Sequence, residues 1–196
     1  MEANMFKKLL ITLIMLLIPT GATLAADNIK LPPPDKEGGM PLMGALNARK
    51  TNRAISPEAL PESEISNLAW AAWGINRADG KRTTPTARNE QKVQLYVALE
   101  SGVWLYKAES HELQRVMSQD LRGNFGGAPL TLIYAAIADS EYSAMHVGSM
   151  YQNAGLYCAS AGLANVVKGS GLKALEDLPL PSGYRVFIAH PIGRPK

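Results

Sequence analysis

The sequence predicts a single α+β domain. Three observations favour this class: two long helical patterns, two short strand patterns joined by a tight turn, and two apolar runs typical of buried strands. The chain has 196 residues, of which 46% are hydrophobic, and this is enough for one sizeable core. Lys and Arg number 20 against 17 Asp and Glu. Without a dense basic run, this small excess argues against a nucleic-acid-binding protein.

Residues 1–25 have the pattern of a secretory signal peptide. Lys7 and Lys8 form a positive region, and Leu9–Ile18 is a largely apolar run. Thr23-Leu24-Ala25 then places small residues before a cleavage site. The apolar run is short for a membrane span, so we expect no stable membrane insertion after cleavage and an exported protein, periplasmic or secreted. An uncleaved N-terminal anchor is the alternative.

Residues 26–40 are expected to form a Pro/Gly-rich linker or arm, because three prolines at 32–34 and the pair Gly38-Gly39 disfavour a helix. The folded domain is then expected over residues 41–196. Its single cysteine, Cys158, lies in an apolar stretch and cannot form an intramolecular disulfide. We therefore interpret Cys158 as a small buried hydrophobe rather than as a nucleophile.

The first helices are expected at residues 42–50 and 62–73. Pro61 suits the first turn of the second helix, and Glu62 and Glu64 suit its positive end. Gly74 supplies the stop. One face of this helix carries its apolar residues: Ile65, Leu68, Ala69 and Ala72, flanked by Trp70 and Trp73 as core or interface residues.

The middle of the chain begins with a polar loop at residues 76–91. Strands are expected at 94–99 and 102–106, and the spacing of Leu113, Val116 and Met117 predicts a helix over 109–121. The glycine-rich run 123–127 lacks the lysine of a P-loop, so it is not interpreted as a phosphate cradle. The apolar run 129–138 predicts a buried strand.

The last third begins with the expected central helix, residues 142–166. Small residues at helical spacing would let another helix or a flat ligand approach it closely: Gly148, Gly155, Ala159 and Gly162. A short helix over 172–177 and a final apolar strand over 184–192 complete the chain.

The sequence contains little acid–base machinery of its own. The three histidines form no metal-ligand spacing: His111 is expected on an exposed helix, His190 in a strand, and His146 at the start of the central helix, where its role stays open. No Gly-x-Ser-x-Gly elbow and no paired carboxylates for glycoside chemistry are present. An enzyme built on this chain would therefore need a cofactor.

The run Arg49-Lys50-Thr51-Asn52-Arg53 suits a phosphate, because two guanidiniums offer bidentate donors and the hydroxyl adds another. Together with later motifs, this run resembles the nitroreductase-like family of FMN flavoproteins, particularly the branch of SagB-type (azoline) dehydrogenases. The resemblance extends from about Leu42 to Gly193. Its other motifs are the helix end Leu68–Arg77, the loop Pro85–Gln91, the central helix, Lys168-Gly169 and the final strand end.

The resemblance implies a nitroreductase-like fold, in which helices flank a central antiparallel sheet and the long central helix lies at a dimer interface. It also implies an FMN site in which basic residues and a hydroxyl hold the phosphate and ribityl chain, Asn89 holds the ring edge, and the partner supplies the Pro85 segment. Lys168-Gly169 would lie near the flavin N5, and residues after the last strand would reach the phosphate. The implied cofactor-binding residues are Arg49, Lys50, Thr51, Arg53, Pro85, Thr86, Ala87, Asn89, Gln91, Lys168, Gly169, Arg194 and Lys196.

The implied activity is that of an FMN-dependent oxidoreductase, with ping-pong hydride transfer through the flavin N5 to or from a small organic substrate. An exported flavin-binding carrier or sensor without turnover is the alternative. The electron donor stays open, as NAD(P)H or another compound, because an exported enzyme has no cytoplasmic nicotinamide pool beside it. Two departures stand out: Lys168 replaces a frequent acidic residue, and the chain ends at Lys196 without the partner-wrapping C-terminal arm of longer relatives. The N-terminal arm is a candidate to replace it.

Overall fold

The computed structural model describes residues 28–196, so the predicted signal peptide lies outside the described residues. Its centre is a seven-stranded sheet in the order β1-β4-β3-β2-β5-β7-β6, in which every neighbouring pair is antiparallel. The strands are β1 (Asn28–Lys30), β2 (Val93–Leu99), β3 (Gly102–Lys107), β4 (Glu112–Met117), β5 (Leu130–Ile137), β6 (Ala164–Asn165) and β7 (Tyr184–Gly193).

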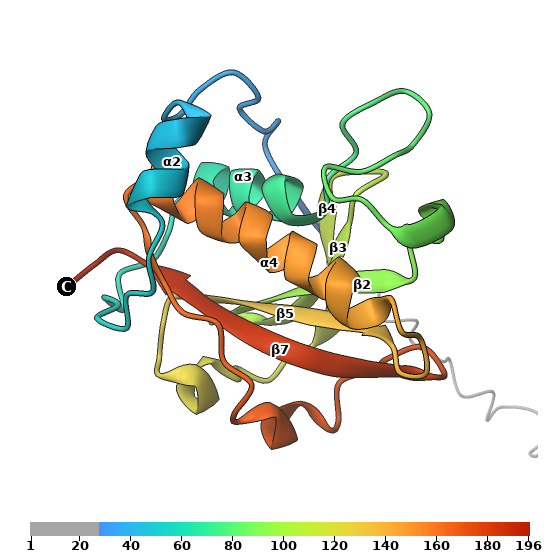
Figure 1. Ribbon diagram of the computed structural model, residues 1–196. Helices are drawn as coiled ribbons and strands as arrows, with labels where there is room; N and C mark the ends of the chain where they lie inside the picture. Colours follow the sequence, from blue (N-terminus) through green and yellow to red (C-terminus); the bar gives the residue numbers. More distant parts are fainter. Residues whose placement is uncertain (1–27) are drawn as a thin grey trace, which may run out of the picture.

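Three α-helices lie on one side of the sheet and two short 3-10 helices lie on the other (Figure 1). The α-helices are α2 (Leu42–Ala48), α3 (Glu62–Trp73) and α4 (Ser143–Ser160). The 3-10 helices on the opposite face are η2 (Arg122–Phe125) and η3 (Leu172–Leu175), and a third, η1 (Ala87–Asn89), precedes β2. The α+β class and the antiparallel sheet predicted from the sequence are confirmed.

The sheet is buried on both faces, and this explains its apolar runs. Along β5, Leu132 and Tyr134 pack into the core beneath α3 and α4, whereas Ile133 and Ala135 pack into the core beside η2 and η3. Because successive side chains of a strand point to opposite faces, a strand covered on both sides needs apolar residues at every position.

The helix over 62–73, the hairpin of β2 and β3, and the strands β5 and β7 lie where the sequence predicts them. The helix expected over 109–121 is wrong, because residues 112–117 form β4, hydrogen-bonded to β3 on one side and β1 on the other. Leu113 faces the core, and its helical spacing to Val116 does not outweigh pairing with two strands.

His111 does not lie on an exposed helix but in the turn between β3 and β4. Its Nδ1 lies 2.9 Å from the Tyr106 hydroxyl, and its Nε2 lies 2.7 Å from Ser66 Oγ and 3.0 Å from the Pro32 carbonyl oxygen. Burial lowers the pKa of His111, against a smaller effect of the Pro32 carbonyl that raises it, and Lys36 adds a still smaller lowering. His111 thus fastens the N-terminal arm to α3 as a neutral group.

Helix α4 ends at Ser160 rather than at Val166. Gly162 adopts a left-handed φ of 68°, and the Leu163 N–H donates to the Cys158 carbonyl at 2.8 Å. Ala164 and Asn165 then pair with β7 as strand β6, so the last residues of the predicted helix belong to the sheet.

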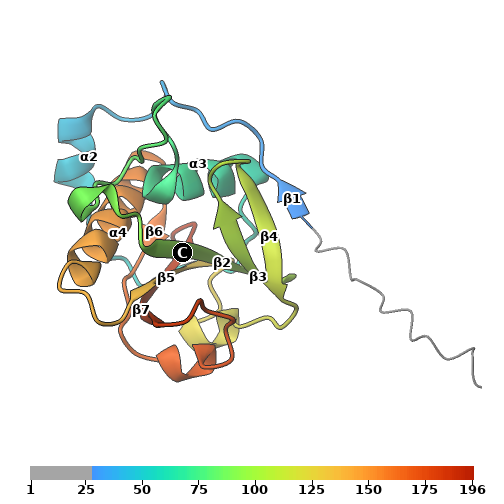
Figure 2. The ribbon, with the colours of Figure 1, turned by 90° about the vertical axis from the view of Figure 1, so that its right-hand side faces the viewer.

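The N-terminal arm is extended, as expected, but it adds strand β1 to the edge of the sheet beside β4 (Figure 2). The arm then contacts two helices. The Asp35 N–H donates to Asn67 Oδ1 on α3 at 2.8 Å, and the Met40 N–H donates to Ser160 Oγ at the end of α4 at 2.6 Å. No helix within residues 28–196 has the length and apolar character needed to cross a membrane.

We expect Gly102→Ala to destabilise the fold by about 3 kcal/mol, because it combines a strained backbone with a steric overlap. Gly102 has a φ of 127°, and an added Cβ would lie 2.2 Å from the Met117 carbonyl oxygen. Gly80 is the control: its φ is 76°, but nothing lies within 4 Å of an added Cβ. Gly80→Ala should cost only about 1 kcal/mol. Equal losses in urea unfolding would contradict the steric part of the argument.

Candidate functional site

The basic run at residues 49–53 is held between β6 and the C-terminus. The Asn52 N–H donates to the Asn165 carbonyl at 2.9 Å. Just beyond the run, the Lys196 N–H donates to the Ala54 carbonyl at 2.9 Å, and the Ser56 N–H donates to the Arg194 carbonyl at 2.8 Å. Segments that are far apart in sequence therefore fix the backbone of this run.

Among the residues that the structure describes, the cations of this run have no acidic partner. Among residues 28–196, no carboxylate lies within ion-pair distance of Arg49, Lys50, Arg53 or Lys168. Arg49, Lys50 and Arg53 are also exposed. Uncompensated cations on neighbouring residues raise the local concentration of anions, so the run can attract a phosphate.

Arg49 lies against the central helix at a glycine. A Cβ added to Gly155 would lie 3.9 Å from Arg49 Cδ and 4.0 Å from Asn165 Oδ1. Gly155 thus provides the close approach that the small residues of this helix predict, and the group that approaches is the stem of an arginine.

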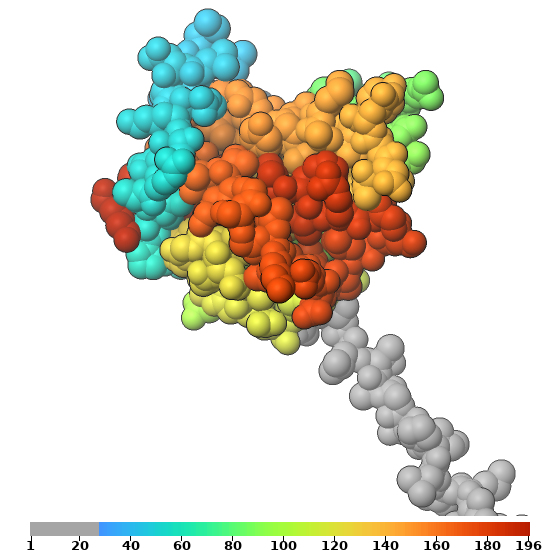
Figure 3. All heavy atoms as spheres, turned by 60° about the horizontal axis from the view of Figure 1, so that its bottom comes forward, coloured from blue at the N-terminus to red at the C-terminus, as the bar shows by residue number. Residues whose placement is uncertain are grey.

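A cavity of about 350 Å³ brings three of the predicted site residues together. Its lining comes from the segment after α2, from the end of η2 and from the chain before η3, and these segments meet on the face shown in Figure 3. No atom lies within 4 Å of a Cβ added to Gly126 or Gly169, so the backbone there is open to a ligand. The lining residues that carry the argument are Arg53, Phe125, Gly126, Lys168 and Gly169.

Lys168 is fixed at this cavity through both its backbone and its side chain. Its N–H donates to the Ala189 carbonyl at 2.8 Å, and its carbonyl accepts from the Ala189 N–H at 3.0 Å. Its Nζ donates to the Phe125 carbonyl at 3.3 Å. The ammonium therefore lies at the cavity beside an aromatic residue.

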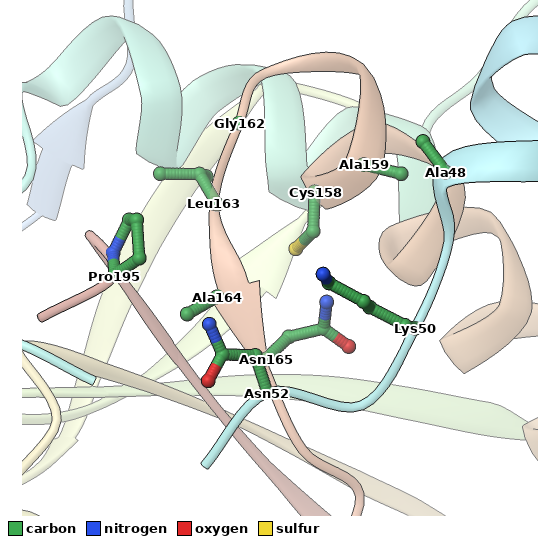
Figure 4. A pocket seen from close by; sticks show the side chains of 10 residues that line it. All are labelled: Ala48, Lys50, Asn52, Cys158, Ala159, Gly162, Leu163, Ala164, Asn165 and Pro195. Carbon is green, nitrogen blue, oxygen red and sulfur yellow. The ribbon is translucent and has the colours of Figure 1, made fainter. Parts of the chain in front are cut away.

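A second cavity, of about 260 Å³, lies on the other side of the basic run (Figure 4). Lys50, Asn52 and Asn165 surround it beneath the end of α4, and Cys158 belongs to its wall. Cys158 is fully buried, and burial raises the pKa of its thiol. It therefore stays protonated, in agreement with a structural role.

A buried hydrogen-bonded chain runs beneath the two cavities from β5 through β7 to β6. His190 Nε2 donates to Asn165 Oδ1 at 3.0 Å, and His190 Nδ1 lies 3.0 Å from the Tyr134 hydroxyl. Burial lowers the pKa of His190 to about 3. The ring is therefore neutral, and Nδ1 accepts from Tyr134. Asn165 lines the second cavity and holds the basic run through its carbonyl, and sequence reasoning missed it because no motif signals it.

The predicted loop at residues 85–91 lies at the other end of α4 (Figure 1). The Ala87 N–H donates to His146 Nε2 at 2.7 Å, so His146 anchors this loop from the first turns of the helix. Burial lowers the pKa of His146, against a smaller effect of Glu90 that raises it. This gives His146 the structural role that the sequence left open.

The remaining predicted contacts are at the C-terminus. The side chain of Lys196 is exposed, and its backbone pairs with the segment after the basic run. The Arg194 guanidinium instead pairs with Glu64 Oε1 at 2.8 Å, so this carboxylate competes with any phosphate for it. Thr51 is exposed on the basic run, and no side chain among residues 28–196 forms a hydrogen bond with its hydroxyl.

The chain belongs to the nitroreductase family, because the sequence model of that family matches residues 46–194. A crystal structure described as a "putative nitroreductase" from Ralstonia eutropha is 37% identical, with a TM-score of 0.79 over 86% of this chain and 90% of that one. A "Putative nitroreductase MJ1384" of Methanocaldococcus jannaschii is 26% identical over 170 residues, or 74% of this chain and 85% of the relative.

A nitroreductase with bound FMN from Desulfitobacterium hafniense shares the fold. Its TM-score is 0.57 at 16% identity, over 79% of this chain and 89% of that one. The nitroreductase-like fold expected from the resemblance is therefore confirmed.

We expect the stability of the protein to fall as the pH drops below about 6.5, in part because of His190. Its pKa is about 6.5 in the unfolded chain and about 3 in the fold, so between these values only the unfolded chain takes up the proton. Between these two pH values, each unit by which the pH falls lowers the free energy of unfolding by up to about 1.4 kcal/mol through His190. His190→Gln should reduce the slope of the unfolding free energy against pH, between pH 6 and pH 4, by about 1.4 kcal/mol per pH unit, which corresponds to one proton. An unchanged slope would show that His190 titrates normally in the fold.

Proposed function

We propose that the chain is an FMN-dependent oxidoreductase that acts on a small organic substrate. Membership of the nitroreductase family and the FMN-bound neighbour support this proposal. The observation that carries it is the cavity at Lys168, where two cations without a carboxylate partner among residues 28–196, an aromatic residue and open glycine backbone meet.

The residues of this cavity fit FMN. A flavin mononucleotide needs cationic donors for its phosphate, polar partners for the ring edge and an apolar wall. Arg53 and Lys168 supply cations, the backbone of Gly169 is unobstructed, and Phe125 supplies an apolar wall. The cavity volume also lies within the usual range for ligand pockets, about 300–1,000 Å³.

FMN, when bound, would supply ping-pong hydride transfer at its N5 between an electron donor and the substrate. The side chains of this chain would bind and orient it: Arg49, Thr51 and Arg53 at the phosphate and ribityl chain, and Lys168 with Gly169 at the ring. Lys196 is a second candidate for the phosphate, whereas Arg194 would first have to leave Glu64.

A second copy of the chain would complete this site. Gly155, beside Arg49, and His146, beside Ala87, are nine residues apart on α4. At 3.6 residues per turn they lie on opposite sides of the helix and about 14 Å apart along its axis. The loop at 85–91 is thus directed away from the cationic run of its own chain, and we propose that it reaches the site of a partner in a homodimer.

An exposed apolar surface on α2 and α4 supports the same proposal. Met43 is 74% exposed, Leu42 65% and Met145 64%. Leu42 and Met43 are neighbours on α2, whereas Met145 lies in the first turn of α4. Large exposed apolar side chains mark protein–protein contact surfaces. A groove of about 330 Å³ that includes Leu42 has an apolar lining from Met40, Leu42, Ala45, Trp70, Leu156 and Tyr157.

Two finer assignments complete the proposal. The run Leu68–Arg77, at the end of α3, supports placement in the SagB-type dehydrogenase branch. The signal-peptide pattern of residues 1–25 supports export to the periplasm or outside the cell, where the electron donor is NAD(P)H or another compound.

The purified protein should carry FMN, at about one per subunit, released by heat and identified by its absorbance spectrum. Arg53→Ala should weaken FMN binding by about tenfold or more, because a charge-assisted hydrogen bond contributes about 1.5–3 kcal/mol. Binding is measured by the quenching of FMN fluorescence during titration of the apoprotein.

Arg185→Ala is the matched control, since Arg185 is an exposed arginine at the far end of β7 and covers Phe187. It should leave the affinity unchanged. A colourless protein that also fails to bind added FMN would refute the proposed function.

Met43→Glu should convert the proposed dimer into monomers and weaken FMN binding at the same protein concentration. A buried carboxylate without a partner is costly at an interface, and the monomer lacks the second half of the site. Light scattering after gel filtration measures the mass. Lys173→Glu, a charge change at η3 on the opposite face, should remain dimeric; a monomeric wild type would contradict the dimer.

A further inference from the structure

Arg82 is an arginine that is held from three directions beside the loop at residues 85–91. Its side chain is only 10% exposed. Its Nη2 pairs with Glu109 Oε1 at 2.7 Å, its Nη1 lies 3.4 Å from the Trp73 carbonyl, and its guanidinium stacks 4.8 Å from the centre of the Trp73 ring. The fourth contact, Nε to Gln91 Oε1 at 2.7 Å, connects this fixed group to the loop.

A directional chain of hydrogen bonds then runs from Arg82 through Gln91 to Asn89. Arginine has donors but no acceptor, so Gln91 must turn its oxygen toward Arg82. The Gln91 amide nitrogen consequently faces the other way, where Nε2 donates to Asn89 Oδ1 at 3.1 Å and lies 3.4 Å from the Gly80 carbonyl. Asn89 must therefore present its oxygen inward, and its Nδ2 is left as an outward donor on an exposed residue.

The backbone of this loop is held in an unusual conformation. Arg88, Asn89 and Gln91 have φ values of 53°, 55° and 52°, in the left-handed region that side chains other than glycine seldom adopt. The Gln91 N–H donates to Thr86 Oγ1 at 3.2 Å, and His146 holds Ala87. Strain of this kind persists only where surrounding contacts maintain it, and it is concentrated at functional sites.

We propose that Arg82 is a positioning residue that, acting through Gln91, fixes the Asn89 amide so that it donates a hydrogen bond to an acceptor atom on the flavin ring edge. The acceptor would be a ring carbonyl oxygen or an unprotonated ring nitrogen. This inference rests on the proposed function and specifies the polarity of the ring contact. A fixed donor at that edge stabilises the negative charge that the ring gains on reduction.

The decisive variant is Gln91→Glu, which keeps the shape of the side chain but replaces the group that donates to Asn89 with an acceptor. A carboxylate accepts from Arg82 as glutamine does, but it cannot donate to Asn89. Asn89 would then turn its amide nitrogen inward and its oxygen outward, toward the ring acceptor. We expect FMN to bind about tenfold more weakly, the flavin midpoint potential to fall, and the thermal unfolding midpoint of the apoprotein to stay close to that of the wild type.

Substitution of Arg82 tests whether this residue orients Gln91 and, through it, Asn89. Arg82→Lys retains one donor for Gln91, so it should keep FMN affinity within about threefold of the wild type. Arg82→Met removes the donor and should weaken binding about tenfold. Glu109→Gln is the control: it removes only the outer ion pair and should leave both affinity and potential unchanged.

Two results would overturn the inference while the wild type still binds FMN. One is a Gln91→Glu protein with unaltered affinity and potential. The other is an equal loss of affinity in Gln91→Glu and Glu109→Gln that follows a lowered unfolding midpoint, since that would make the Arg82 contacts merely structural. If the wild type itself binds no FMN, the proposed function fails, and the inference fails with it.

Discussion

The two-sided pairing of strand β7 is the interaction on which the candidate site depends. β7 pairs with β5 along its length and with β6 at its end, and its Ala189 exchanges two hydrogen bonds with Lys168. The residues that follow it pair with the segment after the basic run. Every segment that lines the cavity at Lys168, apart from the end of η2, is therefore hydrogen-bonded to this strand or to its continuation. The site is a property of the sheet rather than of a flexible loop.

Much of the fold follows from local patterns in the sequence. Helix α3 has a proline at its N-cap, acidic residues at its positive end and an apolar face, so several independent signals agree on its bounds. β5 is apolar at every position because both of its faces are covered, and a short run of this kind predicts a buried strand. The basic run was recognisable because its residue types match the chemistry of a phosphate.

The features that could not be predicted depend on contacts between distant residues. Leu113, Val116 and Met117 have helical spacing, but their segment is a strand because β1 and β3 are available on either side. Gln91 meets Arg82 from a segment whose left-handed residues, Arg88, Asn89 and Gln91, include no glycine to signal the turn. Glu64 suits a helix start from sequence alone, and only the fold reveals that it engages Arg194. Local propensity contains none of this information.

The joining of residues 52–56 to residues 165 and 194–196 has a consequence for how the protein is made. Contacts between the two ends of a chain close last, because the loop between them must be ordered first. The backbone hydrogen bonds that hold residues 52–56 can therefore form only after residues 165 and 194–196 have been synthesised. Removal of residues 194–196 would take away the backbone hydrogen bonds that hold the segment after the basic run in place.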